Sequence, residues 1–286
     1  MAYKKKYVLC CPEGGLNDML CRISICYRYC LATGRILLID TRKVGFREVL
    51  EHYLVSASDR VRIVVTQEDI PQTIYYYPRI GRHIQDYSAG YTETGYKDTA
   101  SGILLKFDFD KDYDEEILLY HDCGGGIDSH EVFDYLRFSP QILQKIATYS
   151  SKIPRPYTAI HLRGTDGFET DYDDLFRYVA EISCTNLFVA SESKYVLNEV
   201  HRRLGMHNIY TFRDFTRADF PVHMYNRDIP LTHDRSTINA QTFIDLGALA
   251  LSDNFLALEK FYSKRWISGY NKLAYFLHLN RARILS

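Results

Sequence analysis

The sequence predicts an α/β fold with two domains, each built around a parallel β-sheet. Short apolar runs of strand length alternate with segments in which apolar residues recur at helical spacing, and this alternation starts twice along the 286 residues. Pro154 and Pro156 separate the two series, so we expect one domain over residues 1–153 and a second over residues 154–286.

The first series opens in the order strand, loop, helix, strand. Its segments are a strand at 7–11, a glycine-containing loop at 12–18, a helix at 19–33 that ends at Gly34, and a strand at 36–40. Parallel strands need a crossover connection, and a helix between two buried strands supplies one. This order therefore predicts a parallel sheet with a right-handed crossover.

The rest of the first half is less regular. We expect strands at 61–65 and 117–120, long loops over the Tyr- and Gly-rich residues 75–102, and a helix at 140–149. The second series repeats the alternation. It comprises strands at 158–162, 186–193, 208–211 and 254–258, helices at 175–182, 195–204, 242–251 and 267–278, and a basic tail.

The strand at 158–162 carries the strongest functional signal. His161 and Arg163 are two residues apart, so on a strand their side chains point to the same face. A ring donor beside a guanidinium fork forms a receptor for phosphate or carboxylate, and the carboxyl end of a parallel strand is where α/β sheets bind ligands. The alternative is that His161 is a satisfied core residue and that Arg163 pairs with Asp166 to close the turn.

The loop at 12–18 is a second candidate anion site. It places Gly14 and Gly15 at the start of a helix, whose free N–H groups and dipole favour negative charge. The spacing is not Gly-x-Gly-x-x-Gly, so a dinucleotide site is not indicated. A tight turn without a ligand is the alternative.

Composition narrows the functional class and the compartment. A formal net charge of -1 gives no reason to expect a nucleic acid partner, while 24 Tyr and 15 Phe allow stacking on sugars. Seven Cys without a Cys-x-x-Cys pair indicate reduced thiols. The apolar start is too short for a signal peptide, and no run of about 18 apolar residues could span a bilayer. We expect a cytoplasmic protein with at most peripheral contact, through its basic tail, to the inner face of the membrane.

Asp108 and Asp110 match the acid-x-acid spacing with which some glycosyltransferases hold a divalent metal. The acids continue through residues 112–116, so a solvated turn is the favoured interpretation. A metal-dependent transferase is the rival that this pair would support.

Three segments in register resemble the fucosyltransferase superfamily, which includes the nodulation-factor and core α-1,6-fucosyltransferases, the α-1,2 enzymes and the protein O-fucosyltransferases. The segments are residues 14–18 with the helix and strand through Asp40, the motif at 161–166 with the pattern His-x-Arg-x-x-Asp, and residues 188–193 followed by Asp245 to Ser263. Residues 41–150 lie outside the likeness.

The resemblance implies a GT-B-like fold, in which two Rossmann-like domains face a cleft, with the acceptor side at 1–153 and the donor domain, with a C-terminal helix, at 154–286. It implies an inverting glycosyltransferase that uses GDP-fucose as donor substrate and needs no metal and no cofactor. Arg163 would hold the donor β-phosphate and act in catalysis, and Asp245 would face the nucleotide base or ribose. The residues implied to bind the donor are Gly14, Gly15, Asn17, His161, Arg163, Asp166, Ser191, Asp245, Ser263 and Lys264.

An inverting transfer also needs a base for the acceptor hydroxyl. The core fucosyltransferases place a Glu in the loop after the His-x-Arg motif, where an ungapped count puts Asp171, with Glu169 nearby. The protein O-fucosyltransferases use a Glu in the first glycine loop, where Glu13 and Asp18 stand. We favour Asp171 or Glu169, and the alternative for each carboxylate is a solvated loop residue.

Two departures from the family pattern leave the donor sugar open. Gly164 stands in place of a second Arg, and Tyr262 with Ser263 in place of a double Ser. The predicted function is transfer of a 6-deoxyhexose, with fucose favoured, to a glycan or lipid-linked oligosaccharide in bacterial surface polysaccharide synthesis. The alternatives are another nucleotide sugar such as dTDP-rhamnose, and a non-catalytic protein of the same fold that binds sugar nucleotides.

Overall fold

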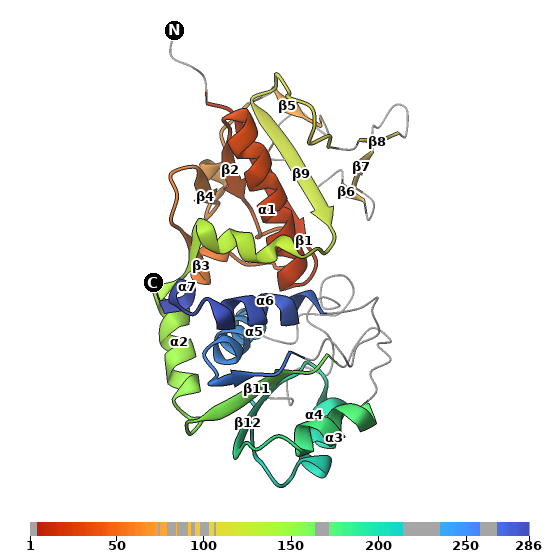
Figure 1. The fold of residues 1–286 in the computed structure, drawn as a ribbon. Helices are drawn as coiled ribbons and strands as arrows, with labels where there is room; N and C mark the ends of the chain where they lie inside the picture. Colours follow the sequence, from red (N-terminus) through yellow and green to blue (C-terminus); the bar gives the residue numbers. More distant parts are fainter. Residues whose placement is uncertain are drawn as a thin grey trace. The chain divides into compact units, whose positions relative to one another are not determined.

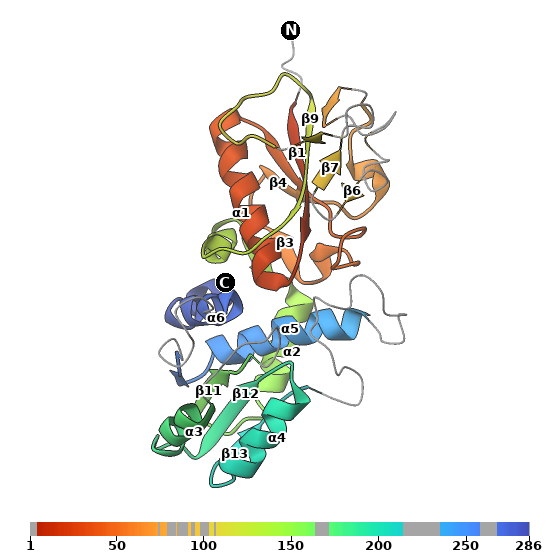
Figure 2. The ribbon, with the colours of Figure 1, turned by 90° about the vertical axis from the view of Figure 1, so that its right-hand side faces the viewer.

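The computed structural model describes residues 5–73, 75–78, 84, 91–92, 95–97, 103–105, 107–163, 172–213, 235–257 and 268–285. The chain divides into two compact units, Met1–Arg137 (unit 1) and Phe138–Ser286 (unit 2), and each has its own parallel sheet (Figures 1 and 2). The predicted α/β fold with parallel sheets is confirmed. The helix predicted at 140–149 falls in unit 2, where Ile146 packs against Gly247, so this division comes earlier in the chain than Pro154.

Unit 1 is built around a five-stranded sheet in the order β4-β2-β1-β9-β5, whose neighbouring strands are parallel. Its strands are β1 (Tyr7–Glu13), β2 (Ile36–Ile39), β4 (Val61–Ile63), β5 (Tyr76–Tyr77) and β9 (Ile117–Cys123). Helix α1 (Leu16–Thr33) connects β1 to β2 and ends at Gly34, which adopts a left-handed φ of 69°. The predicted order of strand, loop, helix and strand is confirmed.

The structure differs from the long loops predicted over residues 75–102. Strands β6 (Tyr91–Thr92) and β7 (Gly95–Lys97) form a three-stranded antiparallel sheet with β8 (Leu104–Leu105), and β5 joins the main sheet. Strands of two or three residues are too short to show a period, which is why the sequence did not reveal them. Unit 1 also contains β3 (Leu54–Ser56), which pairs with β10 (Leu136–Phe138), and 3-10 helices at Leu50–His52, Gln67–Asp69 and Asp128–Asp134.

Unit 2 contains a four-stranded parallel sheet in the order β13-β12-β11-β14. Its strands are β11 (Tyr157–His161), β12 (Asn186–Ala190), β13 (Asn208–Tyr210) and β14 (Asn254–Phe255). Its helices are α2 (Pro140–Ser150), α3 (Tyr172–Ala180), α4 (Lys194–Arg203), α5 (Arg235–Ala250), α6 (Gly269–Leu279) and α7 (Ala282–Leu285). Helix α5 begins at Arg235, earlier than the predicted start at residue 242. The sequence did not indicate these first turns because residues 235–241 are mostly polar, although Asn239 and Ala240 are buried.

The two faces of the unit 2 sheet have different neighbours. Ile160 and Leu162 pack with apolar residues of α3 and α4, whereas His161, between them, points to the opposite face and contacts Tyr270 of α6. Helices α5 and α6 lie on that side of the sheet (Figure 1). The alternation predicted for the strand at 158–162 is therefore confirmed, and it directs His161 toward α5 and α6.

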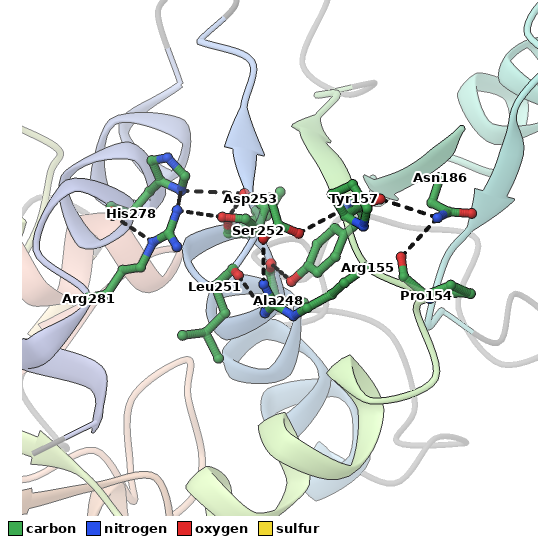
Figure 3. Close-up of polar contacts among 12 residues, drawn as sticks. Pro154, Arg155, Tyr157, Asn186, Ala248, Leu251, Ser252, Asp253, His278 and Arg281 are labelled. Carbon is green, nitrogen blue, oxygen red and sulfur yellow. Dashed lines mark hydrogen bonds and ion pairs between the residues drawn. The ribbon is translucent and has the colours of Figure 1, made fainter. Parts of the chain in front are cut away.

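Polar contacts hold together the amino ends of the unit 2 strands (Figure 3). Asp253 joins β14 to β11, because its carboxylate accepts the Tyr157 N–H at 2.9 Å and pairs with Arg155 at 2.8 Å. The Asn186 side-chain amide, at the start of β12, donates to the backbone carbonyl groups of Pro154 and Pro156. These contacts lie at the amino ends of the strands, opposite the carboxyl ends at which parallel sheets bind ligands.

Candidate functional site

Polar residues at or just after the ends of three neighbouring strands lie at the carboxyl edge of the unit 2 sheet. His161 is the last residue of β11, Ser191 follows β12, and Arg213 comes shortly after β13. From the helices, α5 contributes Asp245 and α6 contributes Tyr270. We call His161, Arg163, Arg213 and Asp245 the arginine cluster.

Burial keeps the imidazole of His161 neutral. His161 is 5% exposed, and its ring centroid lies 4.9 Å from that of Tyr270. Desolvation lowers the pKa of His161 to about 4; Glu192 opposes this change, and the nearby guanidinium groups of Arg163 and Arg213 add to it. At neutral pH the ring therefore offers a hydrogen bond rather than a positive charge.

Asp245 holds Arg213 at this edge. Its Oδ1 accepts a hydrogen bond from Gln241 Nε2 at 2.8 Å, and its Oδ2 lies 3.9 Å from Nε of Arg213. Burial raises the pKa of Asp245 to about 6, while Arg213 and Gln241 lower it in part. The group is mainly a carboxylate at pH 7, so it orients a guanidinium that is itself largely buried.

The structure brings the predicted residues His161, Arg163 and Asp245 into one region. Sequence reasoning missed Arg213, although it is a basic residue just after a strand, as Arg163 is. Tyr270 had no signal in the sequence, because it is one of many aromatic residues and comes from the last long helix.

Ser191 is buried, and its Oγ accepts the Ser193 N–H at 3.2 Å in the turn before α4. Its predicted contact with a donor stays a prediction. Five further predicted residues lie outside the described residues, namely Asp166, Glu169, Asp171, Ser263 and Lys264.

A second group of polar residues lies at the carboxyl edge of the unit 1 sheet. Glu13, the last residue of β1, accepts a hydrogen bond from the Gly45 N–H through Oε2 at 2.8 Å. Its Oε1 lies 3.1 Å from Nε2 of His121 on β9, and the other ring nitrogen lies 3.1 Å from the Tyr96 hydroxyl. The strand predicted at 117–120 ends before His121, but β9 continues through Cys123.

The glycine loop between β1 and α1 packs against its own helix. Gly14 has a φ of 102°, and a Cβ added there would lie 3.0 Å from Cβ of Asp18 in the first turn of α1. Asn17 donates to the Gly126 carbonyl at 3.3 Å. Asp18 stands in the first turn of α1, so a carboxylate already uses the positive end of the helix dipole and would repel a phosphate there. Binding of a donor by Gly14, Gly15 and Asn17 stays a prediction.

The acid-x-acid pair forms a turn. Oδ1 of Asp108 accepts the N–H of Asp110 at 3.0 Å, as in the favoured interpretation. Within the described residues, no group of three His, Cys, Asp or Glu side chains is placed to hold a metal ion. No helix in the described part of the chain is long and apolar enough to cross a membrane.

The fold matches solved fucosyltransferase structures. Fucosyltransferase NodZ from Bradyrhizobium aligns with a TM-score of 0.59 and 14% identity, covering 96% of this chain and 94% of that chain. NodZ α-1,6-fucosyltransferase co-crystallized with GDP gives 0.57 and 14%, with coverages of 96% and 93%. POFUT1 in complex with GDP-fucose gives 0.56 and 13%, with coverages of 95% and 93%. No family model and no curated protein matches the sequence, so the likeness lies in the fold.

Proposed function

We propose that the chain is an inverting, metal-independent glycosyltransferase that transfers a 6-deoxyhexose, with fucose from GDP-fucose as the favoured donor. The observation that carries the proposal is the arginine cluster, in which two guanidinium groups adjoin a neutral imidazole at the ligand-binding edge of a parallel sheet. Solved structures of the same fold contain GDP or GDP-fucose, which supports a nucleoside diphosphate as the ligand.

The leaving group explains the need for arginine at this site. Sugar transfer passes through an oxocarbenium-like state while negative charge grows on the diphosphate. A guanidinium held against that charge stabilises the transition state more than the ground state. By analogy with a lost oxyanion donor, Arg163→Ala would lower kcat about 10²- to 10³-fold. Arg163→Lys would not restore the rate, because an ammonium group cannot make the two-pronged contact.

Arg213 would supply the second positive charge of the donor site. The resemblance places a second Arg at position 164, which is Gly in this chain. Asp245 orients Arg213 from α5, so we propose that Asp245 acts on the donor through this arginine rather than by facing the nucleotide base or ribose. His161 would add one N–H donor to a phosphate oxygen without adding charge.

We propose that unit 1 binds the acceptor. Glu13 and Asp18 place carboxylates at the carboxyl end of β1 and the start of α1, which suits neutral sugar hydroxyl groups and disfavours a diphosphate. From the resemblance we propose a glycan or lipid-linked oligosaccharide acceptor, made for a bacterial surface polysaccharide at the cytoplasmic side of the membrane.

A thermal-shift panel tests the donor site. GDP, GDP-fucose, GDP-mannose, dTDP-rhamnose and UDP-GlcNAc would be added with EDTA to the wild type, Arg163→Ala and Arg202→Ala. Arg202 is the matched control, because it is an exposed arginine of unit 2 that pairs with Glu199. A ligand at 100 times its Kd stabilises the folded state by about 2.7 kcal/mol, and tenfold weaker binding reduces this to about 1.4 kcal/mol.

We expect GDP and GDP-fucose to raise the melting temperature of the wild type and Arg202→Ala equally, and that of Arg163→Ala less. A response to dTDP-rhamnose or UDP-GlcNAc instead would reassign the donor. No response to any nucleotide, or an equal response in Arg163→Ala, would contradict the proposed donor site. A response that appears only when EDTA is replaced by Mg²⁺ would contradict metal independence.

A further inference from the structure

Tyr270 contacts two parts of unit 2 that contribute to the arginine cluster, one through its ring and one through its hydroxyl group. Its ring centroid lies 4.9 Å from that of His161, and the two ring planes make an angle of 50°. Its hydroxyl donates a hydrogen bond of 2.7 Å to the backbone carbonyl of Thr242. From the first turn of α6, Tyr270 therefore joins the end of β11 to α5.

The hydroxyl group of Tyr270 stays protonated and so remains a donor to α5. Burial raises the pKa of Tyr270, and the nearby carboxylates of Asp245 and Glu192 raise it further, while Arg213 acts in the opposite direction. Thr242 precedes Asp245 by three residues, so the two are neighbours on the helix. The hydrogen bond of Tyr270 thus reaches α5 within one turn of the carboxylate that holds Arg213.

Helix α6 holds the Tyr270 ring in place, because it is tied to α5 near its start and to the segment after α5 near its end. The first tie is the hydrogen bond to Thr242. The second is Arg281, just beyond α6, whose Nη2 donates to the Ser252 carbonyl at 2.6 Å (Figure 3). Between these ties, α6 buries the apolar side chains of Leu273, Ala274 and Leu277.

The orientation of the His161 ring matters because the ring carries no charge. Burial lowers the pKa of His161 to about 4, so at pH 7 one ring nitrogen is a donor and the other an acceptor. A phosphate oxygen gains a hydrogen bond from the first and meets a lone pair at the second. The terminal torsion of a histidine is broad, and a packed aromatic ring restricts it. The Tyr270 ring is packed against His161 in this way.

We propose that Tyr270 is a positioning residue of the donor site, which holds the His161 ring in the orientation that donates its N–H to the diphosphate. This inference rests on the proposed donor site. Because the same side chain is hydrogen-bonded to α5, it also keeps His161 in register with the pair formed by Asp245 and Arg213.

A double-mutant cycle separates positioning from a general loss of structure. Calorimetric titration with GDP-fucose at pH 7.5 would give dissociation constants for the wild type, Tyr270→Leu, His161→Leu and the variant with both substitutions. Tyr270→Phe keeps the ring and removes the hydroxyl. Tyr275→Leu is the matched control, because Tyr275 is also on α6 and stacks on a histidine, His278, at a centroid distance of 6.5 Å.

A hydrogen bond to a charged group corresponds to about 10- to 100-fold in affinity, so we expect His161→Leu to weaken donor binding by that factor. By analogy with the outer partners of metal ligands, Tyr270→Leu would weaken it about 10-fold. In the His161→Leu background, Tyr270→Leu would add less than about 2-fold, because the ring that it positions is already absent. Tyr270→Phe would weaken binding less than Tyr270→Leu, and Tyr275→Leu would bind as the wild type does.

Losses that multiply in the double variant would overturn the inference, because Tyr270 would then act independently of His161. An unchanged dissociation constant in Tyr270→Leu or in His161→Leu would also overturn it, while the donor site stands if Arg163→Ala still loses binding. Urea unfolding checks that each variant is folded, and Tyr270→Met replaces Tyr270→Leu if the latter is not. A wild type that does not bind GDP-fucose would instead overturn the proposed function, and the inference with it.

Discussion

Replacing His161 with glutamine tests the electrostatics of the arginine cluster. The pKa of His161 is about 4 in the folded chain against an ordinary value of 6.5, because burial disfavours the charged ring. Between these values the unfolded chain binds more protons than the folded chain, so stability due to this group rises as the pH rises from 4 to 6.5. His161 therefore destabilises the wild type in acid and has no such effect above pH 6.5.

These two pKa values correspond to about 2 kcal/mol of lost stability at pH 5 relative to pH 7.5. Asp245, whose pKa is raised to about 6, acts in the opposite direction. Between pH 3.8 and pH 6 its carboxyl group binds more protons in the folded chain than in the unfolded chain, so its contribution to stability falls as the pH rises. It is present in both proteins and cancels in their difference. We therefore expect the unfolding free energy of His161→Gln, relative to that of the wild type, to increase by about 2 kcal/mol when the pH is lowered from 7.5 to 5.

The assay is urea unfolding at pH 7.5 and pH 5, followed by the fluorescence of the single tryptophan, Trp266 of unit 2. His201→Gln, at an exposed position of α4, serves as the control, and its difference in unfolding free energy from the wild type should change by less than about 0.5 kcal/mol between the two pH values. A wild-type to His161→Gln difference that is the same at both pH values would refute the assignment of His161 as a buried neutral group.

Three further substitutions test the packing that supports the two sheets. Gly247→Ala would place a Cβ 2.5 Å from Cδ1 of Ile146, and we expect urea unfolding to show unit 2 destabilised by about 1–3 kcal/mol. Gly14→Ala would force a side chain into a φ of 102°, and a loss of about 1–3 kcal/mol in thermal unfolding is expected. Asp253→Ala would leave the Tyr157 N–H without this acceptor and cost about 1–3 kcal/mol, measured by urea unfolding. Losses below about 0.5 kcal/mol would contradict each expectation.

Local patterns predicted much of the fold. The first helix was predictable because apolar residues recur along it and Gly34 supplies the left-handed end. The strand that ends at His161 was predictable from its apolar run between two proline breakers and a glycine. The short strands of residues 75–102 were not predictable, because their pairing depends on tertiary contacts rather than on a repeated pattern.

Spacing alone predicted only site residues that stand close together in sequence, and Asp245 was predicted from the family resemblance. His161 and Arg163 share a strand end, so a single motif revealed them. Arg213 gains its place from an ion pair with Asp245, a long-range contact that spacing does not encode. Glu13, one of several candidate bases, has a hydrogen-bond partner, His121, that is 108 positions away in the chain, and spacing does not encode such a contact either.

A crystal structure of the chain with GDP tests the proposed donor site most directly. We predict that the diphosphate lies within hydrogen-bonding distance of the Arg163 guanidinium and the His161 ring, at the carboxyl edge of the unit 2 sheet. Nucleotide bound without contact to Arg163, whether at the glycine loop of unit 1 or in unit 2, would contradict the assignment of the arginine cluster as the donor site.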